Sequence, residues 1–276
     1  MAIITHIELP LLQGSLIWGG FYAIDMSYRQ QVHSFFEELN NSTTYDPYAS
    51  VIQTNGFVNG TWLILLHLVY TQPGATNPPV FAPMLAIPSL FSTLRQATHG
   101  NLTDELDSGT PVNRRPLFAT MTFSNSAAFM ETFFQLANAT SAILASQVPG
   151  LDFSVSYQPW PQTITKHGPE NGGNVLGINA ADGDLTNIDV NLYWDRATDD
   201  DFVYRKTEEL VNAGIKAAKK GSVWNPYLYL NYAEKWQKPI RGYGEDNVKI
   251  LRKMSKKYDP TRTFQEAVFG GFKLDE

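Results

Sequence analysis

Residues 188–194 have the sequence Ile188-Asp189-Val190-Asn191-Leu192-Tyr193-Trp194. Apolar and more polar side chains alternate along this stretch, and successive side chains of a β-strand point to opposite faces of its sheet. The stretch therefore predicts a strand with an apolar face made of Ile188, Val190, Leu192 and Trp194. Its other face carries Asp189, Asn191 and Tyr193.

Two earlier stretches, 152–158 and 117–123, alternate in the same way. In the first, Ser154, Ser156 and Gln158 oppose Phe153, Val155 and Tyr157. In the second, Phe118, Thr120 and Thr122 oppose Leu117, Ala119 and Met121. A sheet whose outer face is only solvated would show this polarity too, so the pattern by itself leaves open whether that face binds anything.

The strands at 117–123 and 188–194 are each followed by a helical pattern and then by another predicted strand, at 152–158 and 226–230 respectively. Two such units in succession predict an α+β fold. We expect a mostly antiparallel sheet with helices layered on one face and an open cavity on the other. We treat residues 1–276 as a single domain, because no Pro/Gly/Ser linker divides them.

The rest of the chain predicts further elements from the spacing of apolar residues and from Pro and Gly. A helix near 28–40 has Asp25 or Ser27 as its N-cap, and prolines impose a loop after Pro73. The other predicted elements are strands at 3–12, 49–53 and 61–70 and helices at 90–97 and 244–257.

The composition of the chain limits the kinds of partner that we expect. The formal net charge is −6, with no basic stripe for phosphates, so we expect neither nucleic acid nor a membrane surface as a partner. The longest apolar stretch, 62–70, is too short to span a bilayer. The N-terminus lacks the pattern of a secretory signal, which favours the cytoplasm. Secretion remains open because of the glycosylation sequons at Asn40, Asn41, Asn59, Asn101 and Asn138.

Several kinds of chemistry have no motif here. The chain contains no cysteine, which excludes disulfides, thiol catalysis and thiolate metal sites. Its five histidines lack metal-ligand spacing, so we expect no metal. Gly172-Gly173 precedes no helix start with the spacing of a phosphate loop, and there is no Gly-x-Ser-x-Gly elbow.

Several motifs spread over the chain give it a family resemblance. Near its two ends are Ile17-Trp18-Gly19-Gly20 and Gly270-Gly271-Phe272-Lys273-Leu274. Between them lie 46–50 (Asp-Pro-Tyr-Ala-Ser), 106–111 (Leu-Asp-Ser-Gly-Thr-Pro), 117–120 (Leu-Phe-Ala-Thr), 172–177 (Gly-Gly-Asn-Val-Leu-Gly), 229–233 (Tyr-Leu-Asn-Tyr-Ala), 243–244 (Tyr-Gly) and 257–260 (Lys-Tyr-Asp-Pro). With these motifs the chain resembles the substrate-binding, C-terminal half of fungal FAD-linked oxidoreductases of the berberine-bridge-enzyme-like group.

The resemblance also indicates what is missing. In that family an N-terminal domain binds FAD through a Gly-His dipeptide and a Cys-containing segment, and this sequence contains neither. We therefore expect a domain without its FAD-binding partner and without a cofactor of its own. Such a domain should self-associate through the vacated surface, as a homo-oligomer and most simply a dimer.

In the family, the sheet face away from the helices lies over the flavin and forms the substrate cavity. Asp189 aligns where relatives often have Glu or Gln, which implies a catalytic acid or base; the alternative is a surface acid paired with Lys or Arg. His67 is a second catalytic candidate, although a lone strand histidine is more often structural. The expected substrate-binding residues are Thr120, Ser156, Gln158, Trp160, Asn191, Tyr193, Tyr229 and Asn231, with His167 as a further wall residue.

Two classes of function remain. The first is a cofactor-independent cyclase of fungal secondary metabolism, for example one that dehydrates its substrate to a quinone methide and directs a hetero-Diels–Alder reaction with a terpene. The second is the partner of a separate FAD-binding chain in a split oxidoreductase, or a non-catalytic binding protein for a hydrophobic metabolite. Both predict a hydrophobic small molecule as the ligand.

Overall fold

The computed structural model describes residues 5–8 and 16–274 of the chain. In this part, nine strands form one sheet in the spatial order β4-β1-β3-β2-β7-β8-β6-β9, and β5 pairs with β1 beside this path. All the pairings are antiparallel, so the predicted α+β fold is confirmed. The strands are β1 (Ile17–Asp25), β2 (Ala49–Val58), β3 (Thr61–Tyr70), β4 (Ser89–Ser92), β5 (Arg95–Ala97), β6 (Arg115–Ser124), β7 (Asp152–Trp160), β8 (Leu185–Trp194) and β9 (Trp224–Asn225).

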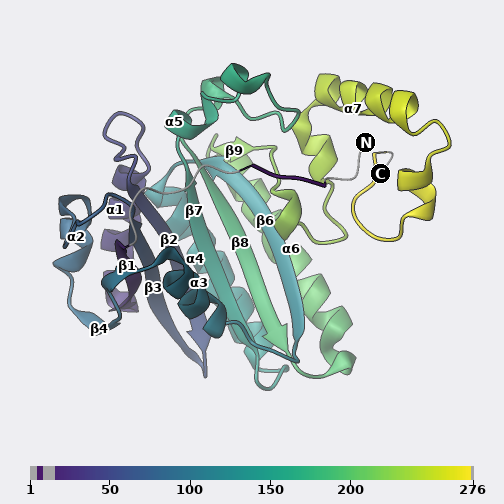
Figure 1. The fold of residues 1–276 in the computed structure, drawn as a ribbon. Coiled ribbons are helices and arrows are strands. Elements are labelled where there is room, and N and C mark those ends of the chain that lie inside the picture. Colours follow the sequence, from purple (N-terminus) through teal and green to yellow (C-terminus); the bar gives the residue numbers. More distant parts are fainter. Residues whose placement is uncertain (1–4, 9–15, 275–276) are drawn as a thin grey trace.

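Three long helices cover one face of this sheet (Figure 1). They are α1 (Arg29–Leu39), α4 (Ala127–Ala145) and α6 (Asp200–Lys220). The first turn of α4 is capped by Ser126, whose side chain accepts a hydrogen bond from the amide of Phe129. The packing of α6 against α4 requires Gly214, because a Cβ there would lie 2.5 Å from the Phe133 ring.

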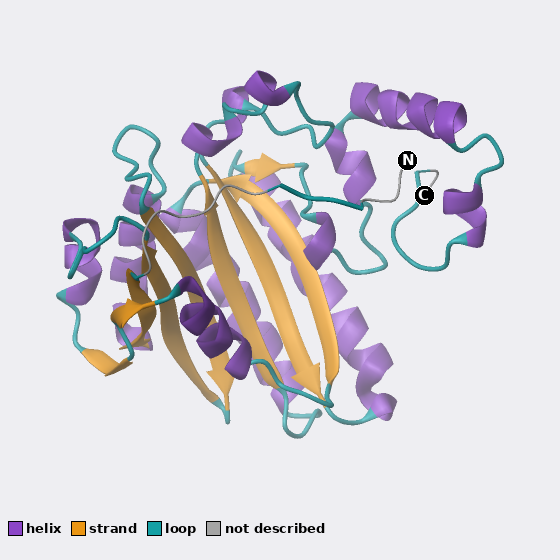
Figure 2. Cartoon of the chain, in the orientation of Figure 1, coloured by secondary structure: helices purple, strands orange, loops and turns teal. Residues whose placement is uncertain are grey.

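The opposite face is only partly covered (Figure 2). Helix α3 (His99–Ser108) lies over it, so the helices are not confined to one face as predicted. Helix α7 (Glu245–Tyr258) stands to one side of the sheet. The other short helices are α2 (Ala82–Leu85), α5 (Gln162–Thr165), η1 (Met26–Tyr28), η2 (Pro79–Phe81), η3 (Pro169–Asn171), η4 (Ala180–Asp182), η5 (Ala197–Asp199), η6 (Leu230–Tyr232), η7 (Pro239–Tyr243) and η8 (Thr263–Ala267).

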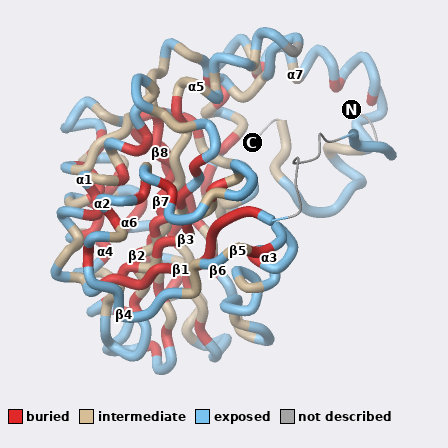
Figure 3. Tube along the Cα trace, turned by 60° about the vertical axis from the view of Figure 1, so that its left-hand side comes forward, coloured by how far each residue is buried: buried red, intermediate tan, exposed pale blue. Residues whose placement is uncertain are grey.

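The main core lies between the sheet and α1, α4 and α6, and the buried residues of Figure 3 are concentrated in the strands. On β8 the residues of the predicted apolar face are at most 1% exposed: Ile188, Val190, Leu192 and Trp194. The neighbouring strands contribute Val155 and Tyr157 from β7 and Ala119 and Met121 from β6. The alternation predicted from residues 188–194 therefore holds across the three adjacent strands.

Two predicted elements near the start of the sheet differ from the structure. The strand predicted at 3–12 lies largely outside the described residues, and the described part, 5–8, is not in a strand. The helix predicted at 90–97 is wrong, because this segment forms β4 and β5 against β1. The helix begins after it at His99, where the Thr98 side chain accepts a hydrogen bond from the amide of Asn101.

The strand predicted at 226–230 is also wrong. Strand β9 contains only Trp224 and Asn225 and ends before Pro226, which has no amide hydrogen to donate to a ladder. Further along β6, the side chain of Gln237, rather than another strand, forms hydrogen bonds with the backbone of β6. Its Oε1 accepts a hydrogen bond from Thr120 N (3.0 Å), and its Nε2 donates to Thr120 O (2.6 Å).

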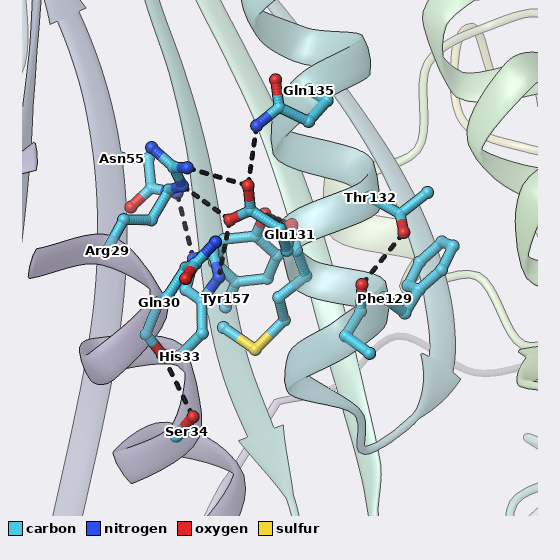
Figure 4. Close-up of polar contacts among 12 residues, drawn as sticks. Arg29, Gln30, His33, Ser34, Asn55, Phe129, Glu131, Thr132, Gln135 and Tyr157 are labelled. Atoms are coloured by element: carbon cyan, nitrogen blue, oxygen red, sulfur yellow. Dashed lines mark hydrogen bonds and ion pairs between the residues drawn. The ribbon is translucent and has the colours of Figure 1, made fainter. Parts of the chain in front are cut away.

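A buried polar network lies between the sheet and the helices (Figure 4). Arg29 of α1 donates two hydrogen bonds to the carboxylate of Glu131 of α4, at 2.7 and 2.8 Å. His33 is 1% exposed, with its Nδ1 3.8 Å from Glu131 and its Nε2 3.5 Å from Asn55 of β2. Burial lowers the pKa of His33 to about 4, so its ring is neutral at pH 7.

We expect Arg29→Ala to lower the free energy of unfolding by about 1–3 kcal/mol, because Glu131 would keep its charge in a mostly buried place with only the Gln135 hydrogen bond left to it. Arg205→Ala is the control, since the pair of Arg205 with Glu209 is exposed and should be worth less than about 0.5 kcal/mol. Urea unfolding followed by circular dichroism measures both changes. Equal losses in the two variants would contradict this role for the network.

Candidate functional site

The centre of the open face is a row of polar side chains that crosses four strands. Register places Thr54 of β2 beside Ser156 of β7, Ser156 beside Asp189 of β8, and Asp189 beside Thr120 of β6. The hydroxyls of Thr54 and Ser156 are 2.8 Å apart and share a hydrogen bond. Asp189 therefore stands between two hydroxyl residues in the middle of the sheet.

The Asp189 carboxyl group is almost completely removed from water. The residue is 6% exposed, and its Oδ1 is buried without a hydrogen-bond partner. Burial raises its pKa from 3.8 to about 7, because desolvation disfavours the charged form. The alternative of a surface acid paired with Lys or Arg does not describe this residue. Near neutral pH the carboxyl group can both accept and release a proton.

A group of aromatic residues lies over this end of the face. Tyr232 accepts a hydrogen bond from Gln158 Nε2 (3.0 Å) and stacks on Phe118, with ring centroids 6.3 Å apart. Burial raises the pKa of Tyr232, and the nearby Asp189 charge raises it further. Tyr229 packs edge-on against Tyr232 at 4.8 Å. Gln158 and Tyr232 thus form a cover close to the buried carboxyl group.

Two adjoining cavities lie along the open face, with volumes of about 320 and 250 Å³, and their linings include Asn191 but not Asp189, Gln158 or Tyr232. We call them together the groove. They share a floor that includes Thr54, Ser154, Asn191 and Tyr193, and they share a wall at Gly109 and Pro111, directly after α3. Most of the remaining lining is apolar, including Val58, Leu63, Leu65, Phe91, Phe21 and Leu106.

The structure separates the two predicted catalytic residues. His67 lines the groove from β3, whereas Asp189 is on β8, with β2 and β7 between them. Three strand spacings of ~4.8 Å put them roughly 14 Å apart, too far to act on the same bond. Burial lowers the pKa of His67, its ring packs against Phe21 at 5.1 Å, and its Nε2 has no hydrogen-bond partner.

The predicted binding residues fall into separate groups. Asn191 and Tyr193 line the groove, and Ser156 lies beside Asp189. Thr120 is fully buried, and its hydroxyl donates to Ile188 O at 2.7 Å. Trp160, at the end of β7, packs against Tyr227 and Tyr229.

Two residues named in the prediction lie on the surface. Asn231 is exposed, and its side chain donates a hydrogen bond to the Tyr229 hydroxyl (2.9 Å). His167 is also exposed, with its Nδ1 2.8 Å from Glu170. Neither residue lines the two cavities of the groove.

Sequence reasoning missed three features of this face. Asn187 continues the polar side of β8, and extending the alternation by one step before Ile188 would have found it. Gln237 supports β6 through its side chain, and no local pattern signals that contact. The wall at Gly109 and Pro111 belongs to the quoted motif 106–111, but its place over the sheet depends on the fold.

Neither a metal site nor a membrane-spanning helix is found in residues 5–8 and 16–274. No cluster of three or more His, Asp or Glu side chains there is arranged to hold a metal ion. None of the helices in the same residues combines the length and apolar character needed to cross a membrane. The sequon residue Asn40 is fully buried, and its amide donates to Leu185 O.

The chain is similar in sequence to fungal proteins. It is 32% identical over 263 residues to FAD-dependent monooxygenase sdcF of Emericella nidulans, covering 94% of this chain and 54% of that protein. It is 32% identical over 295 residues to FAD-dependent monooxygenase elcE of Phaeosphaeria nodorum, covering 99% of this chain and 82% of the relative. The chain spans about half the length of the first of these relatives. No family model matches it.

Solved structures with this fold include oxidases and BBE-like proteins. The 6-hydroxy-D-nicotine oxidase of Arthrobacter nicotinovorans matches with a TM-score of 0.67 at 10% identity, over 91% of this chain and 54% of the oxidase. Physcomitrella patens BBE-like 1 matches with a TM-score of 0.61 at 12% identity, over 89% of this chain and 52% of that protein. At such low identity these matches establish the fold alone.

The raised pKa of Asp189 has a consequence for stability. Its folded-state pKa lies above its unfolded value, so the cost of burying the charge is absent below about pH 4, grows up to about pH 7 and is constant above it. We expect Asp189→Asn to stabilise the protein above pH 7 by up to about 4 kcal/mol, with the difference vanishing near pH 3.

Urea unfolding at several pH values measures this difference. Asp104→Asn, at an exposed position of α3, is the matched control and should leave stability nearly unchanged at every pH. A difference between wild type and Asp189→Asn that does not depend on pH would contradict the assignment of a raised pKa to this residue.

Proposed function

The chain belongs to the family of fungal proteins named FAD-dependent monooxygenases, and on that premise we propose that the open face of its sheet binds a hydrophobic metabolite on which Asp189 transfers a proton. The groove holds the body of the metabolite, and the reacting end lies under the cover formed by Gln158 and Tyr232. The chain supplies positioning and proton transfer in this proposal.

The observation that carries the proposal is the buried, unpartnered Oδ1 of Asp189. A buried polar atom without a partner costs stability, and a ligand or a reaction that uses the atom is one explanation for keeping it. A general base works best when its pKa is near the working pH, and burial raises the pKa of Asp189 to about 7. The residue thus has both the free lone pair and the proton affinity that a base requires.

The size and lining of the groove support a hydrophobic organic ligand. Its two cavities, of about 320 and 250 Å³, adjoin one another and fall near the lower end of the range for small-molecule sites. Most of the lining is aliphatic or aromatic, with a few polar groups from β7 and β8. This arrangement is typical of sites in which apolar contact gives affinity and a few hydrogen bonds fix orientation.

The Gly172-Gly173 pair does not fit the pyrophosphate of FAD. Gly172 and Gly173 both have positive φ angles, but they follow η3 and lead into a loop rather than into an α-helix that could face a pyrophosphate. A bound FAD would supply electron acceptance for the relatives' type of reaction. The residues of the open face fit the substrate side of such a reaction.

A second candidate is the cofactor-free cyclase, in the form of dehydration to a quinone methide followed by hetero-Diels–Alder addition of a terpene. The same Asp189 observation favours it, since proton transfer and loss of water need no electron acceptor. Holding two apolar reactants together in the groove could lower the barrier by as much as ~7–11 kcal/mol. His67, at the far side of the groove, would then contact the second reactant.

We expect Asp189→Asn to reduce turnover by about 100-fold to 10,000-fold while the protein stays folded, because the amide cannot accept the proton. Wild-type turnover should fall as the pH drops below about 7, since the base becomes protonated. Turnover is measured by mass spectrometry on aromatic and terpenoid metabolites from the producing fungus. Asp104→Asn is the control, and full activity of Asp189→Asn would overturn the proposed role.

The two candidates differ in their need for a flavin. If the chain acts on the substrate side of a flavin reaction, turnover should require added FAD with its binding domain and an electron acceptor such as oxygen. If it is a cyclase, the colourless purified chain should convert the substrate under anaerobic conditions without FAD. Visible absorption spectra together with anaerobic and aerobic assays decide between them, and ligand binding without turnover in either assay would contradict both.

A further inference from the structure

We propose that the metabolite bound on the open face is an aromatic compound with at least two hydroxyl groups, bound by a row of acceptor oxygens on β8. This inference rests on the proposed function and adds the chemical class of the ligand. It also assigns a role in recognition to Asn187 and Asn191, which flank Asp189 on the same face of the strand.

The row consists of Asn187 Oδ1, Asp189 Oδ1 and Asn191 Oδ1. Each atom is buried and has no hydrogen-bond partner. A buried polar atom without a partner is uncommon, and here three occur at successive positions on one face of one strand. A ligand that completes their hydrogen bonds would account for all three unpartnered oxygens at once.

These three oxygens accept hydrogen bonds, so the ligand must supply the donors. The amide of Asn187 is oriented by its Nδ2, which donates to Thr120 Oγ1 (3.0 Å), Thr122 Oγ1 (3.1 Å) and Met121 O (3.4 Å). Its oxygen is therefore the free atom. Carboxylate and amide oxygens accept hydrogen bonds, and hydroxyl groups are the donors that a neutral organic metabolite brings.

The spacing between the oxygens of the row limits which ligands can bind to them. Alternate residues of a strand are roughly 6.8 Å apart, so one hydroxyl cannot reach two of these oxygens. A metal ion cannot join them either, because cation–oxygen bonds of ~2.5 Å would hold the oxygens within about 5 Å of one another. The row instead fits a rigid ligand with hydroxyl groups on separate rings.

The surroundings favour flat aromatic rings. The rings of Phe118 and Tyr193 lie 6.4 Å apart in an edge-to-face arrangement, and Tyr232 stacks on Phe118. Asn191 lies in the groove, whereas Asp189 and Asn187 lie further along β8, near the Gln158–Tyr232 cover. A ligand in the groove meets Asn191 first, and Asp189 lies two residues before it on the same face of β8.

The test uses a dihydroxynaphthalene with one hydroxyl on each ring, together with its dimethyl ether, which has the same rings and no donors. Isothermal titration calorimetry on the full chain should give at least about 10-fold tighter binding of the diol. Asn191→Leu should reduce this preference to about 3-fold or less. Asp104→Asn is the control, since Asp104 is at an exposed position of α3 and lines neither cavity of the groove.

Equal binding of the diol and the ether to the wild-type protein would overturn the inference, as would failure of the diol to bind at millimolar concentration. So would a loss of preference in Asp104→Asn as large as in Asn191→Leu. These outcomes are distinct from failure of the proposed function, which depends on turnover by Asp189→Asn. Full activity of that variant together with a preference for the diol would leave a binding site without the proton transfer.

Discussion

The site depends on the position of β8 in the middle of the sheet, with β7 on one side and β6 on the other. Because side chains alternate along a strand, the residues that anchor β8 in the core force Asp189 and its two asparagine neighbours onto the opposite face. On an edge strand, water would reach the Asp189 carboxyl group from the side. Here flanking strands and aromatic residues exclude it, which accounts for the raised pKa.

Two carboxyl groups on the two faces of the sheet, those of Glu131 and Asp189, contrast in their partners. On the helix-covered face, Glu131 is paired with Arg29 by two hydrogen bonds, and nearby Arg29 lowers the pKa of the Glu131 carboxyl group. On the open face, Asp189 Oδ1 has no partner. The first arrangement stabilises the fold, because the two hydrogen bonds from arginine offset much of the free-energy cost of removing the carboxylate from water. The second costs stability, which is the usual condition of residues kept for binding or catalysis.

The comparisons fit this division between fold and site. Sequence identity to the 6-hydroxy-D-nicotine oxidase and to BBE-like 1 is only 10% and 12%, yet both TM-scores exceed 0.6. An antiparallel sheet needs apolar residues at alternate positions but tolerates many different ones, so its architecture survives extensive replacement. The positions on the open face are free of that packing constraint on one side. They can therefore differ between relatives while the sheet and its three covering helices stay the same.

The sequence by itself determined the local elements and their faces. Period-two alternation located β6, β7 and β8, the 3.6-residue spacing located α4 and α6, and the alternation placed Asp189 on the face away from the core. It failed at 90–97 and 226–230, where the outcome depends on pairing with β1 and on the Gln237 side chain, contacts with residues far away in the chain. Tertiary structure alone decided that Asp189 is desolvated and unpartnered and that His67 is distant from it. Burial and distance are properties of the assembled strands, and no stretch of sequence contains them.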